Sequence, residues 1–165
     1  MTTIEKYPLD RSKILKKTLV ALMGWLTILV ICGLFVGLAA SAAGGPTVAL
    51  TALGILAIIF ILIAILQYWY ETQYFAKYFY DIRSDFLIIR KGVFAPRETT
   101  LPYNKLQDVY MDQDLFDRLF NLWDVHVSTA TLMSGFEAHI DGVKIANAEK
   151  LREMLLENIR GTKGN

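Results

Sequence analysis

Charge is missing from a long internal block of this chain. Between Thr18 and Tyr70 there is no Asp, Glu, Lys, Arg or His, while the segments on both sides carry charges at ordinary density. The whole chain is 54% hydrophobic, with a mean hydropathy of +0.37. These features exclude an ordinary soluble protein, and we expect the charge-free block to face lipid.

Cysteine and histidine are equally scarce. The single cysteine, Cys32, lies inside the charge-free block, which excludes an intrachain disulfide and a cysteine metal cluster. His126 and His139 are the two histidines, and neither stands at metal-ligand spacing or beside a nucleophilic serine or cysteine. Because no phosphate-binding glycine loop is present either, we expect no catalytic residue, no metal site and no cofactor.

A basic excess is also absent. From Glu71 to Asn165 there are twelve Lys and Arg against fourteen Asp and Glu. This near balance argues against a nucleic-acid partner, since nucleic-acid binders usually carry a clear positive excess.

Two segments of the charge-free block, residues 18–40 and 48–69, are each long enough to cross a hydrocarbon core of about 30 Å. Between them, Gly44, Gly45 and Pro46 break helices, and the connection of residues 41–47 is short. We therefore predict a transmembrane helical hairpin over residues 18–70. A cleaved signal peptide is disfavoured, because the apolar run is too long and a second span follows.

The flanking charges predict the orientation of this hairpin. Five cations and only two acids, Glu5 and Asp10, precede the first span, whereas the connection between the spans carries no charge. The positive-inside rule then predicts a multi-pass protein of the cell membrane with both termini cytoplasmic. Residues 1–17 form a cytoplasmic N-terminal segment, and Tyr68, Trp69, Tyr70 and Tyr74 anchor the inner end of the second span at the membrane interface.

Small residues recur at helical spacing in the first span. Gly33 and Gly37, extended by Ala40, would let another helix approach closely. Two partners are open: the second span of the same chain, or another copy of the chain. Because the spans contain no ionisable group, a transporter or channel is disfavoured.

Residues 71–165 suffice for one small domain, and most of them have a β pattern. We predict strands over residues 77–82, 86–91, 98–101, 106–111, 124–130 and 136–140, with a turn at residues 83–85 joining the first two. A short helix capped by Asp114 is predicted after the fourth strand, with Leu115 and Leu119 on one side. A longer amphipathic helix is predicted over residues 147–160, with Asn147 as N-cap and Gly161 as stop. Its apolar stripe comprises Ala148, Leu151, Leu155 and Ile159.

Aspartates are densest around that short helix, at positions 108, 112, 114 and 117. They could hold a hard cation. The alternative, which we favour, is structural: Asp108 and Asp112 project from one strand, Asp114 caps the helix, and Asp117 stabilises its first turn.

Four ordered blocks of this domain resemble the YdbS-like bacterial membrane proteins with a PH-like domain, of the bacterial PH domain family. The blocks are residues 84–97 (SDFLIIRKGVFAPR), 101–109 (LPYNKLQDV), 113–122 (QDLFDRLFNL) and 125–130 (VHVSTA). The resemblance implies a cytoplasmic PH-like domain over residues 71–165: two antiparallel sheets forming a partly open barrel, with a C-terminal capping helix. Two departures are Asn121, where the family usually has Gly, and six predicted strands where seven are expected.

Basic residues gather around the first predicted hairpin of this domain: Arg83, Arg90, Lys91, Arg97 and Lys105. In PH folds generally this region binds anionic headgroups, and a tethered domain lies beside an anionic leaflet. The alternative is a solvated sheet edge, where cations discourage edge pairing.

The sequence thus predicts a non-catalytic, membrane-anchored PH-like module that binds a protein partner or anionic lipid headgroups. A structural subunit of a homo-oligomeric membrane assembly is the alternative. The expected partners are the lipid bilayer, and a second PH-like membrane protein or another copy of this chain.

Overall fold

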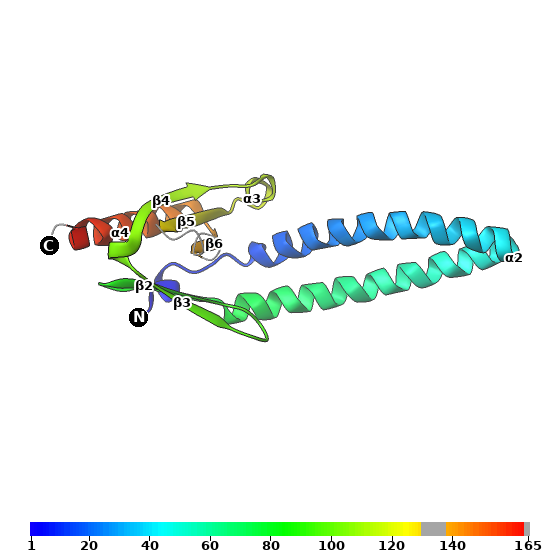
Figure 1. The fold of residues 1–165 in the computed structure, drawn as a ribbon, viewed down its shortest axis with the longest axis horizontal. Coiled ribbons are helices and arrows are strands. Elements are labelled where there is room, and N and C mark those ends of the chain that lie inside the picture. Colours follow the sequence, from blue (N-terminus) through cyan, green and yellow to red (C-terminus); the bar gives the residue numbers. More distant parts are fainter. Residues whose placement is uncertain (130–137, 164–165) are drawn as a thin grey trace. The chain divides into compact units, whose positions relative to one another are not determined.

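The computed structural model describes residues 1–129 and 138–163. The chain divides into two compact units (Figure 1). One consists of Lys17–Thr72, and the other combines Met1–Lys16 with Gln73–Asn165. Residues 1–16, nearly all of the predicted N-terminal segment 1–17, thus form one compact unit with the β domain.

The long helix α2 (Ser12–Lys77) supplies the whole of the first unit. Its most hydrophobic 18-residue window has a mean hydropathy of 3.1 and is not buried by the rest of the chain, so by length and composition it could cross a membrane. Large apolar side chains, Phe35, Leu38 and Leu50 among them, stay about 70% exposed. A helix that is apolar all round needs lipid or protein to cover it.

Gly45 interrupts α2 with φ 79° and ψ −174°, and Pro46 follows it. Glycine adopts positive φ without a steric penalty, and a residue before proline is driven out of the helical region. The chain is helical on both sides of this one residue. A break at a single residue therefore replaces the predicted seven-residue connection at residues 41–47. Beyond the break, Leu53 Cδ2 lies 3.7 Å from where a Cβ of Gly33 would stand.

Two three-stranded antiparallel sheets and a C-terminal helix give the other unit a PH-like arrangement. The first sheet has the order β1-β2-β3 and the second β4-β5-β6. The strands are β1 (Phe79–Ile82), β2 (Phe86–Lys91), β3 (Arg97–Pro102), β4 (Leu106–Asp112), β5 (Trp123–Thr129) and β6 (His139–Val143). The helices are α1 (Thr3–Lys6), the 3₁₀ turn η1 (Tyr103–Lys105), α3 (Leu115–Phe120) and α4 (Ile145–Lys163).

Several predicted boundaries shift. β1 starts at Phe79 because α2 continues through Lys77. β6 runs on to Val143, beyond the predicted end at residue 140, because Gly142 takes φ 79° within the strand. Ala130 and residues 136–137 of the predicted strands lie outside the described residues.

The helices also correct two details. Asn147 is not the N-cap of α4, since the helix begins at Ile145 and the backbone N–H groups of Asn147 and Ala148 both donate to Lys144 O at 2.9 Å. Gly161 does not stop it either, because a glycine within the last turn still permits helix. The apolar stripe is confirmed, with all four predicted side chains in the core.

Asp114 caps α3 as expected, and Asn121 ends it in the left-handed conformation at φ 52°. The apolar residues of α3 do not enter the core. Leu115 is 82% exposed and Leu119 71% exposed, while Asp117 is the buried residue of the helix. The reason is an ion pair that draws the acidic side of α3 inward, described below.

The N-terminal segment fastens both sheets together. Thr3 donates its backbone N–H and its hydroxyl to Asp81 Oδ1 of β1, at 2.9 and 3.0 Å. Tyr7 and Leu9 are buried in the core. Asp10 N then donates to Gly142 O of β6 at 2.8 Å. We call residues 1–16 the N-terminal strap.

Candidate functional site

An open groove of about 570 Å³ lies where α2 ends and the turn between β2 and β3 begins. Its lining combines apolar and basic side chains: Ala76, Lys77, Tyr78, Phe79, Arg90, Val93, Phe94 and Pro96. We call this region, together with Arg97 at the start of β3, the β2–β3 face. It can offer both cations and apolar contacts to a ligand.

The turn between β2 and β3 has a conformation that requires glycine at position 92. Gly92 has φ 116°, and a Cβ there would stand 2.7 Å from Ala95 O, so only glycine fits. Lys77 Nζ donates to Val93 O at 2.9 Å, which fastens the turn to the last turn of α2. Phe94, next along, is 79% exposed. A phenylalanine held outward in this way is an unusual surface feature.

Arg90 lies beside this turn on the outward side of β2. Its guanidinium carbon is 5.1 Å from the Phe79 ring centroid, and its Nη1 is 4.0 Å from Glu98 Oε2. The side chain stays about half exposed. Lys91 points elsewhere: it is 17% exposed, with its Nζ 3.8 Å from Asp141 Oδ1. Arg90 is therefore accessible to a ligand, whereas Lys91 lies in the buried ionic network around Asp141.

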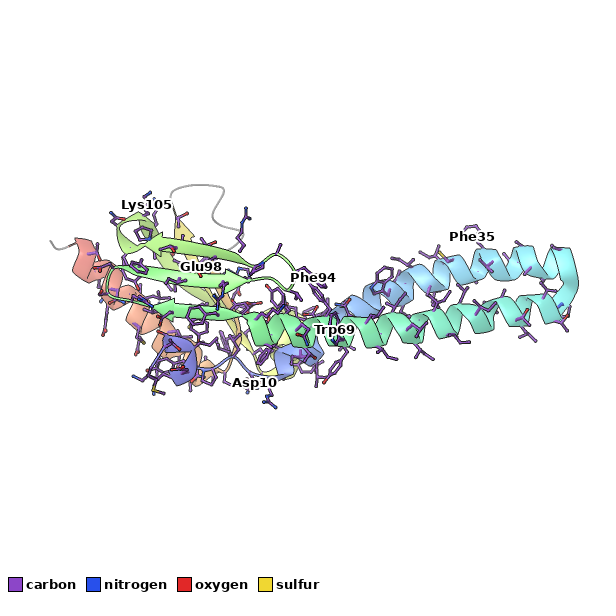
Figure 2. All side chains as sticks on the ribbon, turned by 90° about the horizontal axis from the view of Figure 1, so that it is seen from below. Asp10, Phe35, Trp69, Phe94, Glu98 and Lys105 are labelled. Carbon is purple, nitrogen blue, oxygen red and sulfur yellow. The ribbon has the colours of Figure 1, made fainter. Side chains whose placement is uncertain are left out.

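The five basic residues predicted as one contact fall into two groups. Arg90, Lys91 and Arg97 all lie at one end of the first sheet, where the register pairs Arg90 with Glu98 and Lys91 with Arg97 on the other face. Arg83 follows β1 at the opposite end, where its Nε donates to Asp81 Oδ2 at 3.1 Å. Figure 2 shows Lys105 at that same end, away from Phe94. Arg83 lies at the level of Phe86, four positions or about 13 Å along β2 from Arg90, so the two groups cannot contact one small ligand together.

The predicted interface aromatics divide between the units. Tyr68, Trp69 and Tyr70 lie on α2 and are between 36% and 50% exposed. Tyr74 belongs to the β domain, where its ring centroid is 6.1 Å from that of Tyr78. The sequence analysis did not single out Phe94. The feature that could have indicated it is a large apolar residue in a turn between Gly92 and Pro96.

On α2, Gly33 and Gly37 line a shallow apolar groove with Leu53 and other leucines. A Cβ at Gly37 would stand 3.9 Å from Leu53 Cδ2. At both positions an added Cβ would make only an ordinary van der Waals contact with Leu53 of the same chain, so the contact seen there does not require glycine. Ala40, the third predicted residue, is not among the lining side chains.

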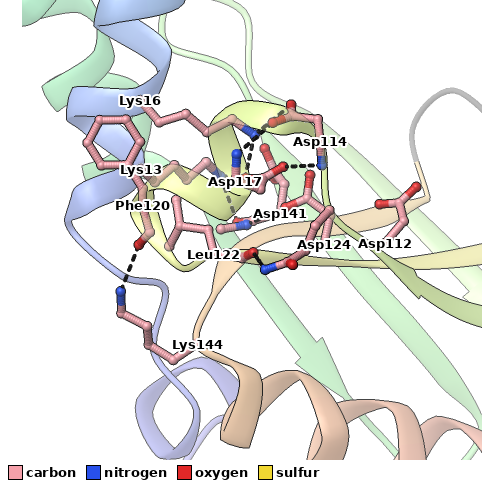
Figure 3. Close-up of polar contacts among 12 residues, drawn as sticks. Lys13, Lys16, Asp112, Asp114, Asp117, Phe120, Leu122, Asp124, Asp141 and Lys144 are labelled. Carbon is pink, nitrogen blue, oxygen red and sulfur yellow. Dashed lines mark hydrogen bonds and ion pairs between the residues drawn. The ribbon is translucent and has the colours of Figure 1, made fainter.

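A buried ionic network lies under α3 (Figure 3). Lys13 Nζ is 2.9 Å from Asp141 Oδ1, and the two side chains are 3% and 5% exposed. Lys16 pairs with Asp117, which is 2% exposed, and with Asp114 at 2.9 Å. Burial alone would lower the pKa of Lys16, but hydrogen bonds to Asp117 and Asp114 outweigh it and raise that pKa.

This network accounts for part of the predicted aspartate group. Asp114 and Asp117 cap α3 reciprocally and bind Lys16, so their role is structural. Asp112 lies on β4 opposite Asp124, and its Oδ1 is 3.1 Å from His126 Nε2. Ligand atoms of Asp112, Asp124 and His126 lie within 4.8 Å of one another, a spacing that a divalent cation could use.

The pKa values of two titratable groups near this network are shifted strongly. Burial, together with the charges of Asp141 and Asp117, raises the pKa of Asp124 from 3.8 to about 6. Burial and the nearby Lys91 lower the pKa of His139 from 6.5 to about 4. Between about pH 4 and 6, both groups therefore favour their neutral forms in the folded state.

Residues 18–159 match the Bacterial PH domain family, which covers α2 from its second turn, both sheets and most of α4. The chain belongs to the Bacterial PH domain family. This confirms the resemblance carried by the four sequence blocks. Neither a curated protein nor a solved structure matches the chain.

The opposed pKa shifts predict opposed pH dependences. Between pH 3.8 and 6 folded Asp124 binds more protons than the unfolded chain, so its contribution to the free energy of unfolding falls as pH rises. Between pH 4 and 6.5 folded His139 binds fewer, so its contribution rises. Asp124→Asn should therefore gain stability relative to the parent as pH rises from 4 to 6, by up to about 1.4 kcal/mol per pKa unit removed.

His139→Gln should lose stability relative to the parent over the same range. Denaturant unfolding of the full chain in detergent at several pH values measures both differences. Parallel curves for the parent and both variants would contradict the assigned shifts.

Proposed function

We propose that this protein is a non-catalytic, membrane-anchored PH-like module whose β2–β3 face docks on anionic lipid headgroups. Phe94 carries the proposal, because an outward phenylalanine that lines one groove with Lys77 and Arg90 combines an apolar side chain with phosphate-binding cations. The Bacterial PH domain family is generally not catalytic, which agrees with this assignment.

The energies of such a contact suit a tethered domain. Each basic residue near an anionic surface contributes about 1 kcal/mol, and partial burial of a phenylalanine adds about 1 to 2 kcal/mol. With contributions of this size, a domain without a membrane anchor would bind lipid only weakly. Because the apolar helix holds the domain beside the bilayer, the effective concentration is high and a weak contact is sufficient.

We further infer that residues 18–40 and 48–69 cross the membrane as a hairpin, with both termini in the cytoplasm. One compact unit contains both Met1–Lys16 and Gln73–Asn165, so the helix between them must leave and return on the same side of a membrane. The break at Gly45 and the approach of Leu53 to Gly33 support a reversal near the middle of α2.

A structural role in a homo-oligomer is the second candidate. The apolar groove along Gly33 and Gly37 has a volume of about 400 Å³, and a helix of another copy could pack there in addition to Leu53. The same groove suits a helix of a second PH-like membrane protein. Either partner would use the membrane-crossing helices and leave the β2–β3 face available to lipid.

The topology is tested by thiol labelling in intact cells. With Cys32 replaced by Ser, a cysteine at Ser41 should react with a membrane-impermeant reagent, and a cysteine at Thr162 should react only after the cells are opened. Labelling of both positions, or of Thr162→Cys alone, would contradict the hairpin.

Lipid docking is tested on the full chain, because residues 1–16 belong to the folded unit. A Phe94→Cys variant in the Cys32→Ser background carries a polarity-sensitive fluorophore and is placed in nanodiscs. We expect blue-shifted emission with phosphatidylglycerol present, and a smaller shift with phosphatidylcholine alone. The shift should weaken as the Debye length falls from about 10 Å at 0.1 M salt to about 3 Å at 1 M.

Arg90→Gln with Arg97→Gln should remove the dependence on anionic lipid. Lys105→Gln is the matched control, because Lys105 is an exposed cation at the other end of the first sheet. Equal emission in both lipid compositions, or an equal effect of the control, would refute docking through this face.

A further inference from the structure

Besides Phe94, the β domain also exposes large apolar side chains on α3. Leu115, Arg118 and Leu119 are all exposed, at helical positions that place them on one face. In the described part of the chain no carboxylate pairs with Arg118. Two leucines with an arginine between them form the pattern of a helix face that lies in a membrane interface.

The ionic network fixes where this face lies along the chain. Lys16 holds α3 through Asp114 and Asp117, at the start of the helix. Lys16 is two residues, or about 3 Å along a helix, from Thr18, where the charge-free block begins. α3 is therefore held within one lysine side chain of the point where the chain becomes apolar.

We infer that α3 is a second bilayer contact, in which Leu115 and Leu119 enter the interfacial layer and Arg118 meets a lipid phosphate. The inference rests on the proposed function, since it requires the domain to sit on the membrane. Lys16 pairs with both Asp114 and Asp117, which offsets one of their two negative charges, and Asp117 is buried away from any surface.

The charge pattern favours lipid over a second copy of the chain as the occupant. Arg118 suits a phosphate, and the acidic residues next to the leucines already have partners in the strap. The two contacts would lie beside the two ends of α2: Phe94 beside Lys77, and α3 beside Lys16. Two such points restrict the tilt of a domain on a surface more than one point does.

Nitroxide accessibility tests the inference on the full chain in nanodiscs containing phosphatidylglycerol. Spin labels are placed singly at Leu119→Cys, Phe94→Cys and Arg152→Cys, each in the Cys32→Ser background. Arg152 is the control, because it is exposed on α4. We expect the ratio of oxygen to nickel-chelate collision rates to be several-fold higher at position 119 than at position 152.

Each other outcome has a definite meaning. A label at 119 that behaves like the label at 152, while 94 is lipid-exposed, overturns the α3 contact and leaves the proposed function standing. If 94 and 119 both behave like 152, both proposals are wrong. A label at 119 that is shielded from both reagents indicates a protein occupant and also overturns the inference.

A second variant guards against perturbation by the label. Leu115→Ser with Leu119→Ser should fold with little change in stability, because both side chains are exposed. With this double variant the β domain should be held less firmly on the bilayer, and a spin label at position 94 should therefore move faster. Unchanged motion at 94 would contradict a second contact.

Discussion

The buried ion pair between Lys13 and Asp141 holds the strap to the second sheet and is the most deeply buried charge pair that joins them. Both side chains are almost fully buried, and Lys13 Nζ also donates to Asp141 O at 3.1 Å. Gly142 must be glycine beside them, since a Cβ there would stand 2.6 Å from Lys13 Cδ. The lysine also lies 4.0 Å from the Tyr78 ring centroid, so it contacts the residue that follows α2.

The strap turns two separate chain ends into one folded unit. Thr3 is bonded to the first sheet and Asp10 to the second, so the segment bridges both. The next residues carry Lys13 and Lys16 into the network and then lead into the apolar part of α2. The β domain is thereby connected in the chain to both ends of the apolar helix.

Local features were predictable from the sequence and nonlocal ones were not. The cap at Asp114, the turn at residues 83–85 and the stripe around Leu151 each depend on neighbours within a few positions. The strap escaped prediction because Lys13 and Lys16 resemble ordinary positive-inside charges, and their partners lie about 100 or more residues away. Arg83 and Arg90 were grouped by sequence proximity, but an extended strand separates them.

A double-mutant cycle on Lys13 and Asp141 tests the central claim most directly. The free energy of unfolding of the full chain in detergent is measured for the parent, Lys13→Met, Asp141→Asn and the double variant. Each single change should destabilise the fold by about 3 to 5 kcal/mol, because it leaves a buried charge without its nearest partner. The account predicts a coupling energy of at least about 2 kcal/mol, and additivity within about 0.5 kcal/mol would contradict it.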